Sequence, residues 1–418
     1  MAHGVAASRP RGIILILADD LGVGDVSCLQ GKDFLTPNID SLAREGVLFT
    51  DGYASAPVCM PSRCGLLTGR PPAAFGVQTN PNEDGTETKD QGLPVSEKTL
   101  AQHLQSAGYR TALIGKWHLG ETPAQHPLRR GFDEFFGFLG GHTDYTHSGE
   151  LLRGKTPVSE SGYLTEVLTR EALAFLDRNK FGNFFLCLTY NAVHSPMQAS
   201  DAYLSQVPKE ITDPGRRIAA AMTLALDAGV GAVAEKLGSL GLDRDTLVVF
   251  TSDNGAKIKF KTSNGALRGE KGTLYEGGIR VPFFMKYPSA WPSGMKISFP
   301  VSSLDFHPTL MALVGNELPT ESAAGVNLAP HLSGAAPDRA IYWKWGPSSG
   351  AVRKGKWKYF KTWNDSALFD LETDPAEKIN RAETEPQTTA ELKTLLQVWE
   401  KSLPPPLWGP PQWFKKPG

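Results

Sequence analysis

The chain has 418 residues, of which 40% are hydrophobic and 21% charged, and its formal net charge is −1. That length accommodates one large α/β domain with a small one, or two medium domains. The balanced charge argues against a nucleic-acid binder or a polybasic membrane surface, so a bound anion must meet positive charge concentrated in a pocket. Four cysteines (Cys28, Cys59, Cys64 and Cys187) are too few for a disulfide framework and lack the spacing of a zinc site.

Neither a membrane span nor a signal peptide is visible in the sequence. No apolar run reaches the ~18 residues of a span. Residues 1–10 lack the apolar core that a signal peptide requires. Because the first strand begins almost at once, the chain starts as a mature or trimmed one would.

The aliphatic run 12–18 predicts a buried parallel strand, and Asp19 and Asp20 follow it directly. Adjacent carboxylates repel each other unless something positive lies between them. Hard cations take such oxygen ligands, and open α/β sheets bind ligands at the carboxyl ends of their strands. A solvated turn is the alternative, because aspartate is a common turn residue.

Residues 59–70, CMPSRCGLLTGR, predict a short helix. Pro61 suits its first turn and Gly69 its left-handed stop. Cys59 would then lie at the helix N-terminus, which favours negative charge. Arg63, four residues on, leans back toward Cys59 along the same face. The alternative is a buried structural cysteine beside an unrelated arginine.

Two further strands end in basic side chains. The strand 109–115 leads into Lys116-Trp117-His118, where alternate residues share a side, so Lys116 and His118 face one pocket and Trp117 turns into packing. An exposed lysine and a core histidine are the alternative. The strand 183–190 places His194 just beyond its end, where a lone histidine is usually structural.

The later part of the chain adds oxygen ligands and one more lysine. The strand 247–252 precedes Asp253 and Asn254, whose carboxylate and amide oxygens suit a hard cation. The glycine-rich loop 267–278 carries Lys271. The loop 142–147, with His142 and Tyr145, either lines a substrate pocket with polar donors and one stacking ring or is an ordinary solvated loop.

After about residue 336 the predicted elements become short strands followed by a helix. This predicts a first domain over 1–335 and a small α+β subdomain with an extended tail over 336–418. The remaining expectations are a helix from Thr36 through Ala43, a surface loop over 71–98, helices over 99–107, 164–176 and 216–240, strands over 341–345, 351–362 and 367–371, a helix over 385–403 and an extended tail from 404.

The string C-x-P-S-R from Cys59 to Arg63, followed by L-L-T-G-R, resembles the signature of the type I sulfatases. In that family the cysteine is oxidised after translation to formylglycine, whose hydrate is the nucleophile. The strings T-P-N-I-D, G-K-W-H-L-G, N-A-x-H-x-P and G-x-K-G-x-x-x-E-G-G also resemble the family, so the likeness extends over nearly the whole chain.

The resemblance implies an α/β fold of the alkaline-phosphatase type: a large, mostly parallel mixed sheet flanked by helices, then a small C-terminal antiparallel sheet plus helix. It also implies the role of each candidate residue. Asp19, Asp20, Asp253, Asn254 and the modified Cys59 would bind a divalent metal, Ca²⁺ or alternatively Mg²⁺. Arg63 would orient the formylglycine and His118 would hydrogen-bond its hydroxyl, while Lys116, His194 and Lys271 would hold the sulfate oxygens.

The activity implied is hydrolysis of sulfate esters, with a sulfated galactose or N-acetylgalactosamine unit as substrate, as in glycan sulfatases of the N-acetylgalactosamine-6-sulfatase type. A phosphonate monoester or phosphodiester hydrolase of the same superfamily is one alternative. A non-catalytic glycan-binding relative with unconverted Cys59 is another. A formylglycine-generating enzyme is the expected partner, no nucleic acid is expected, and a periplasmic or secreted location fits enzymes of this kind.

Overall fold

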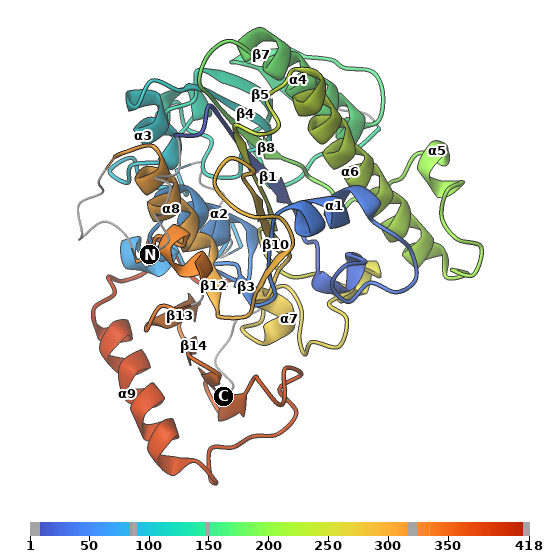
Figure 1. The fold of residues 1–418 in the computed structure, drawn as a ribbon. Coiled ribbons are helices and arrows are strands. Elements are labelled where there is room, and N and C mark those ends of the chain that lie inside the picture. Colours follow the sequence, from blue (N-terminus) through green and yellow to red (C-terminus); the bar gives the residue numbers. More distant parts are fainter. Residues whose placement is uncertain are drawn as a thin grey trace.

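The structure is a computed structural model that describes residues 9–83, 85, 90–146, 151–316, 324–333 and 335–412 (Figure 1). Its centre is a ten-stranded mixed sheet. In spatial order the strands are β11 (Met295–Ile297), β2 (Val47–Phe49), β10 (Phe283–Lys286), β9 (Thr246–Ser252), β1 (Gly12–Ala18), β8 (Phe184–Thr189), β4 (Arg110–Lys116), β5 (Glu134–Phe138), β6 (Leu151–Arg153) and β7 (Thr156–Val158).

The four central strands run parallel. β1 pairs in parallel with β8 and with β9, and β8 pairs in parallel with β4. The carboxyl ends of β9, β1, β8 and β4 therefore meet at one edge of the sheet, where open α/β sheets bind ligands. This confirms the predicted buried strands and brings the residues that follow them to one place.

Helices cover both faces of the sheet (Figure 1). One layer contains α1 (Pro37–Glu45), α4 (Leu164–Asn179) and α6 (Pro214–Ser239), and the other contains α2 (Cys59–Thr68), α3 (Leu100–Ser106) and α8 (Phe306–Leu313). β1 serves both layers, since Ile13 and Leu15 pack into one core while Ile14 and Ile16 pack into the other. Burial on two faces is why β1 is a continuous aliphatic run.

Helix α6 is, among the described residues, long and apolar enough by length and composition to cross a membrane. The prediction concerned an unbroken apolar run, and Asp227 interrupts the apolar residues of this helix. Because 67% of its most apolar stretch is buried inside the protein, α6 has the character of a core helix. It packs on α4 and α1 over the sheet.

The C-terminal part forms an antiparallel sheet of β13 (Ala340–Trp345), β14 (Ser349–Lys354), β15 (Trp357–Lys361) and β16 (Ser366–Asp370), covered by α9 (Pro386–Lys401). The predicted sheet and helix are confirmed, but the single strand expected over 351–362 is wrong. The chain reverses there at Gly355, whose φ of 57° is the left-handed conformation that glycine adopts easily.

The described part of the segment 71–98 is a loop, as predicted, but much of it is buried. It contains the 3₁₀ turn η2 (Pro72–Phe75) and buries Val77 and Leu93 completely. Part of the tail crosses it, because the Leu407 N–H donates to the Gly76 carbonyl (2.9 Å) and Trp408 Nε1 donates to Thr79 Oγ1 (3.1 Å).

Short elements complete the described chain: strands β3 (Gly52–Tyr53) and β12 (Val301–Ser302), helices α5 (Asp201–Leu204) and α7 (Glu276–Ile279), and 3₁₀ turns η1 (Val23–Asp25), η3 (Pro127–Arg129), η4 (Ile258–Phe260), η5 (Ser303–Asp305) and η6 (Ala329–Ser333). β3 and β12 pair in parallel as a separate two-stranded sheet.

Gly69 ends α2 with φ 69°, and a Cβ there would lie 2.6 Å from His307 Nδ1. We expect Gly69→Ala to lower the free energy of unfolding by about 2 kcal/mol or more, through left-handed strain plus the steric clash. Gly108→Ala is the matched control, because Gly108 has φ 82° but nothing within 4 Å of an added Cβ. Denaturant unfolding measures both, and equal losses would contradict the close packing at His307.

Candidate active site

Cys59 is the first residue of α2 and is 2% exposed. The helix begins and ends as predicted, with Pro61 in its first turn and Gly69 in the left-handed conformation at its end. The N–H of Met60 donates to Asn80 Oδ1 (3.1 Å), which satisfies one of the free donors of the first turn. The nucleophile candidate therefore sits on a capped helix end rather than on a mobile loop.

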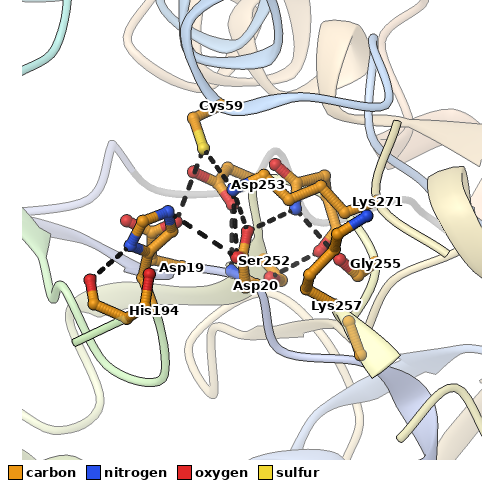
Figure 2. Close-up of polar contacts among 12 residues, drawn as sticks. Asp19, Asp20, Cys59, His194, Ser252, Asp253, Gly255, Lys257 and Lys271 are labelled. Carbon is orange, nitrogen blue, oxygen red and sulfur yellow. Dashed lines mark hydrogen bonds and ion pairs between the residues drawn. The ribbon is translucent and has the colours of Figure 1, made fainter. Parts of the chain in front are cut away.

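Figure 2 shows the Cys59 sulfur directed toward the carboxylates that follow β1. Cys59 Sγ lies 3.1 Å from Lys271 Nζ and 3.7 Å from Asp19 Oδ1. Burial raises the pKa of the thiol to about 12, although Lys116 and Lys271 lower it. The helix N-terminus and the nearby lysines thus do not produce a thiolate, because the loss of water around the sulfur outweighs them.

The three predicted carboxylates lie together and are almost completely buried. Asp19 Oδ2 is 2.6 Å from Lys116 Nζ, and Asp20 Oδ1 is 2.7 Å from Lys271 Nζ. The backbone N–H of Asp20 donates to Asp253 Oδ1 (3.2 Å), which ties the end of β1 to the end of β9. Each carboxylate is thus held by a cation or a backbone donor from a neighbouring element.

Arg63 joins two of these carboxylates. Its guanidinium lies 2.8 Å from Asp253 Oδ2 and 3.4 Å from Asp19 Oδ2, and Nη1 donates to the Lys116 carbonyl (3.2 Å). Arg63 was predicted to lean back toward Cys59, and it does lie in the same cluster as Cys59. Its donors go to carboxylates and a carbonyl, so Arg63 fixes the framework around Cys59 without a direct bond to the sulfur.

The buried charges shift the acidities of Asp19 and Asp253 in opposite directions. Burial alone would raise the pKa of Asp19, but Lys116, His194 and Arg63 outweigh it and hold that pKa below its usual range. Burial together with the charge of Asp19 raises the pKa of Asp253 to about 6. The difference follows from where the cations lie, because Lys116 and His194 act most strongly on Asp19 whereas burial dominates at Asp253.

The donor set fits a hard divalent cation. Single ligand atoms of Asp19, Asp20, Cys59 and His194 lie within 4.8 Å of one another. Asn254 donates through Nδ2 to Asp20 Oδ1 (2.7 Å), and its buried Oδ1 has no hydrogen-bond partner among the described residues. Carboxylate and amide oxygens of this kind are calcium and magnesium ligands.

His194 faces the same carboxylates from the loop after β8. Its Nδ1 lies 2.7 Å from the Ser195 carbonyl and its Nε2 lies 3.8 Å from Asp20 Oδ2. Because a carbonyl only accepts, Nδ1 carries a proton and Nε2 is the atom free to gain or lose one. Burial lowers the pKa of His194, against the opposing effect of Asp19 and Asp20.

His118 follows β4 as predicted, on the side of Lys116, while Trp117 is buried in the core and donates through Nε1 to the Gln125 carbonyl. Burial and the charges of Lys116 and Arg63 lower the pKa of His118 well below its usual value. The imidazole is therefore neutral, and its buried Nδ1 has no hydrogen-bond partner within the described part of the chain. Such a nitrogen is available as a proton acceptor.

The loop predicted to line a pocket divides into two parts. His142 is exposed, and its ring stacks on that of His194 with 6.4 Å between centroids. Tyr145 is wrong as a stacking platform, because it is fully buried, lies against Tyr163 and donates its hydroxyl to the carbonyls of Asn191 (2.6 Å) and His194 (2.9 Å). His147, the end of the predicted loop, lies outside the described residues.

Two contributors escaped prediction from the sequence. Ser252, the last residue of β9, accepts from the Leu21 N–H (3.0 Å) and donates to the Asn254 carbonyl (3.0 Å), which fixes the turn that carries the acidic residues. Its place directly before Asp253 is the only local signal. Asn80 caps α2 from a distant loop, and nothing in its local sequence indicates this role.

Known proteins resemble the chain over most of its length. Residues 11–316 match the family described as Sulfatase, and residues 269–402 match the family described as N-sulphoglucosamine sulphohydrolase, C-terminal. N-acetylgalactosamine-6-sulfatase of Sus scrofa is 35% identical over 86% of this chain and 73% of its own length. Arylsulfatase A of Homo sapiens is 33% identical over 90% of this chain and 80% of its own length.

Solved structures share the fold. The crystal structure of Ps i-CgsB in complex with k-i-k-neocarrahexaose has a TM-score of 0.91 and 35% identity, covering 96% of this chain and 95% of that one. The phosphonate monoester hydrolase of Agrobacterium radiobacter has a TM-score of 0.71 at 21% identity, covering 94% of this chain and 96% of that one, which is a likeness of fold alone. The family match over 11–316, with the identity to these relatives, shows that the chain belongs to the sulfatase family and is a sulfuric ester hydrolase.

Proposed function

We propose that the enzyme removes sulfate from a sulfated carbohydrate of the galactose or N-acetylgalactosamine type. The observation that carries the sulfate chemistry is the convergence of Lys271 and Lys116 with His194 around the carboxylate cluster beside Cys59. These side chains offer positive charge where sulfate oxygens would lie. The sugar is supported by relatives named for N-acetylgalactosamine-6-sulfate and by a structural neighbour bound to a carrageenan oligosaccharide.

The rim of the site supports a hydroxyl-rich substrate. His142 is exposed beside His194, and the loop 257–264, which leads toward Lys271, carries the exposed Lys259 and Lys261. Polar groups that pair with sugar hydroxyls discriminate against substrates that lack them. The likeness to a phosphonate monoester hydrolase, at 21% identity, is one of fold and gives the phosphonate alternative no support.

The nucleophile in this proposal is the formylglycine hydrate made from Cys59. The unmodified thiol does not suit the task, because burial raises its pKa to about 12 and leaves it protonated at neutral pH. A cysteine that is only 2% exposed is also out of reach of another enzyme in the folded chain. The proposed maturing enzyme therefore acts before folding is complete.

The proposed metal is Ca²⁺, held by Asp19, Asp20, Asp253, Asn254 and the modified Cys59. Four oxygen-bearing side chains favour Ca²⁺, since Mg²⁺ usually keeps several waters and leaves fewer places for protein ligands. A cation bound here supplies positive charge that neutralises the sulfate oxygens and activates a hydroxyl group.

The two histidines divide the proton transfers. Nδ1 is engaged at the Ser195 carbonyl (2.7 Å), so Nε2 is the nitrogen that gains a second proton. In that imidazolium form, which the charges of Asp19 and Asp20 favour against burial, His194 is suited to protonate the leaving alcohol through Nε2. Lys271 stands on the other side of Cys59 and supports the same oxygens. His118, neutral at physiological pH because its pKa is lowered, is suited to accept the proton of a hydroxyl group beside Cys59.

The location remains a proposal that follows from the substrate. A sulfated polysaccharide is met outside the cytoplasm, so we expect the enzyme in the periplasm or secreted.

The substrate is tested by a panel of galacto- and gluco-configured sulfated sugars, with a simple aryl sulfate beside them. We expect a galacto-configured sugar to have the highest kcat/KM, and Cys59→Ala to lose at least about 10³-fold on every substrate while remaining folded. If the aryl sulfate is best and no sugar is desulfated, the carbohydrate proposal is wrong. A Cys59→Ala variant with the wild-type kcat would overturn the nucleophile.

The metal is tested by elemental analysis together with kinetics. We expect the purified enzyme to contain Ca²⁺, and Asp253→Ala to lose the metal and at least about 10²-fold in kcat/KM together. Asp245→Ala is the control, since Asp245 precedes the opposite end of β9 and bonds the Ser289 hydroxyl near the surface. Full activity in thoroughly chelated, metal-free enzyme would refute the metal site.

The acid is tested by comparing leaving groups. A sugar alcohol needs a proton as it departs, whereas a nitrophenolate does not. We therefore expect His194→Ala to lower kcat/KM by about 10²-fold or more on a sugar sulfate and by at least about tenfold less on nitrophenyl sulfate. Equal losses on both substrates would assign His194 to sulfate binding alone.

A further inference from the structure

The loop that carries Lys271 is held on one side by contacts inside the catalytic domain, among them the bond from the Ile258 N–H to Glu270 Oε2 (2.8 Å). Its backbone bonds to neighbouring segments there include those from the Lys271 N–H to the Ala256 carbonyl (3.0 Å) and from the Gly272 N–H to the Pro57 carbonyl (2.9 Å). Yet Lys271 Nζ must reach both Cys59 Sγ (3.1 Å) and Asp20 Oδ1 (2.7 Å). The position of this loop therefore decides where one of the sulfate-holding charges lies.

The C-terminal part of the chain contacts the same loop through buried charged side chains. Lys358, on β15, lies 2.9 Å from Glu276 Oε1 and 2.9 Å from Glu377 Oε1, and all three side chains are fully buried. The Glu276 N–H donates to Glu377 Oε2 (2.7 Å), and Arg268 Nη1 donates to the Glu377 carbonyl (2.9 Å). We call Lys358, Glu276 and Glu377 the clamp. It holds the loop at Glu276, five residues after Lys271, and at Arg268, three residues before it.

Aromatic contacts reinforce the clamp between its two ends. The ring of Tyr275 lies 4.6 Å from that of Phe360 on β15, centroid to centroid, and the Arg268 guanidinium covers Tyr275 at 4.0 Å. Trp345, at the end of β13, is close enough to Gly272 for a Cβ there to touch it at 3.6 Å. The small sheet thus contacts the loop at Gly272, Tyr275 and Glu276, beyond Lys271, while Glu377 holds Arg268 before it.

The charge of the clamp is compensated within a larger buried group. Glu276 also accepts from the Tyr53 hydroxyl (2.7 Å), and Arg353 on β14 lies 2.6 Å from Asp51 Oδ2. Buried ion pairs add little stability compared with apolar packing, because desolvation offsets their attraction. Their directional geometry specifies one arrangement of the loop, which apolar contacts alone would not.

We propose that Lys358 and Glu377 of the C-terminal subdomain are positioning residues for Lys271. They fix Glu276 and Arg268, and through them the intervening loop, so that the Lys271 ammonium meets the substrate sulfate beside Cys59. This inference rests on the proposed role of Lys271 in holding sulfate oxygens. A displacement of about 1 Å at such a group is enough to lower the rate by up to about 10²-fold.

The test compares Glu377→Gln with Glu400→Gln. Glu377→Gln keeps the size of the side chain but removes one charge of the clamp. Glu400→Gln is the matched control, because Glu400 on α9 accepts from Lys344 (3.0 Å) and binds the same small sheet without touching the loop. For each variant we measure kcat, KM, the thermal midpoint and hydrogen exchange of the peptide spanning 268–278.

We expect Glu377→Gln to lower kcat/KM by at least about tenfold and to speed exchange in the peptide 268–278. Glu400→Gln should change kcat/KM by less than about twofold, even if it lowers the thermal midpoint as much as Glu377→Gln does. Unchanged kcat/KM in Glu377→Gln, or equal losses of kcat/KM in both variants, would overturn the proposal. The clamp would then stabilise the packing of the small sheet without positioning Lys271.

A second variant tests the proposal even if Glu377→Gln does not fold. Phe360→Leu removes the ring that packs on Tyr275 without disturbing any charge, and we expect faster exchange in 268–278 with a loss of about threefold or more in kcat/KM. Exchange does not depend on turnover. Wild-type enzyme that fails to hydrolyse any sulfate ester would therefore contradict the proposed function, whereas a loop whose exchange is unchanged in both variants would contradict the clamp alone.

Discussion

Three buried carboxylates lie at the carboxyl edge of the central parallel strands, and the rest of the structure must compensate their charge. Asp19 and Asp20 directly follow β1, Asp253 directly follows β9, and all three are buried. A charged group that is removed from water must be paired or neutralised. Lys116 and Lys271 come to them from two other segments. The fold can therefore be understood as the means of bringing cations from distant parts of the chain to this edge.

Each compensating group is itself held by the packing behind it. Arg63 is placed by α2, whose end is closed by Gly69 and whose first turn is capped by Asn80. Lys116 is the last residue of β4, so its position follows from the strand register. Lys271 is on a loop, and the structure places the small C-terminal sheet directly against it. The large sheet thus supplies Lys116 and the helix supplies Arg63, while Lys271 comes from a loop that the small sheet packs against.

Local sequence was sufficient to predict the parts that depend on short-range chemistry. Continuous aliphatic runs predicted the central strands because both faces of the sheet are covered, and polar residues directly after them marked the edge. The motif around Cys59 predicted both the short helix and the family. The candidate residues consequently come together as expected, apart from Tyr145.

The break at Gly355 is a local feature, whereas the groups misjudged or missed near the site depend on distant neighbours. Tyr145 looked like a free ring, yet Tyr163 and two carbonyls bury it. Cys59 looked activated by its helix end, yet burial raises its pKa to about 12. Lys358 gave no signal at all, since its partners Glu276 and Glu377 are far from it in sequence. Burial and long-range pairing are properties of the folded chain, which local patterns do not contain.

Mass spectrometry of the peptide that contains Cys59 tests the central chemistry most directly. The peptide is taken from an active preparation and treated with an aminooxy probe that labels aldehydes. Formylglycine at this position predicts a peptide lighter than the cysteine form and labelled by the probe, with activity proportional to the labelled fraction. A preparation that hydrolyses sulfate esters at the full rate while residue 59 is entirely an unlabelled thiol would contradict it.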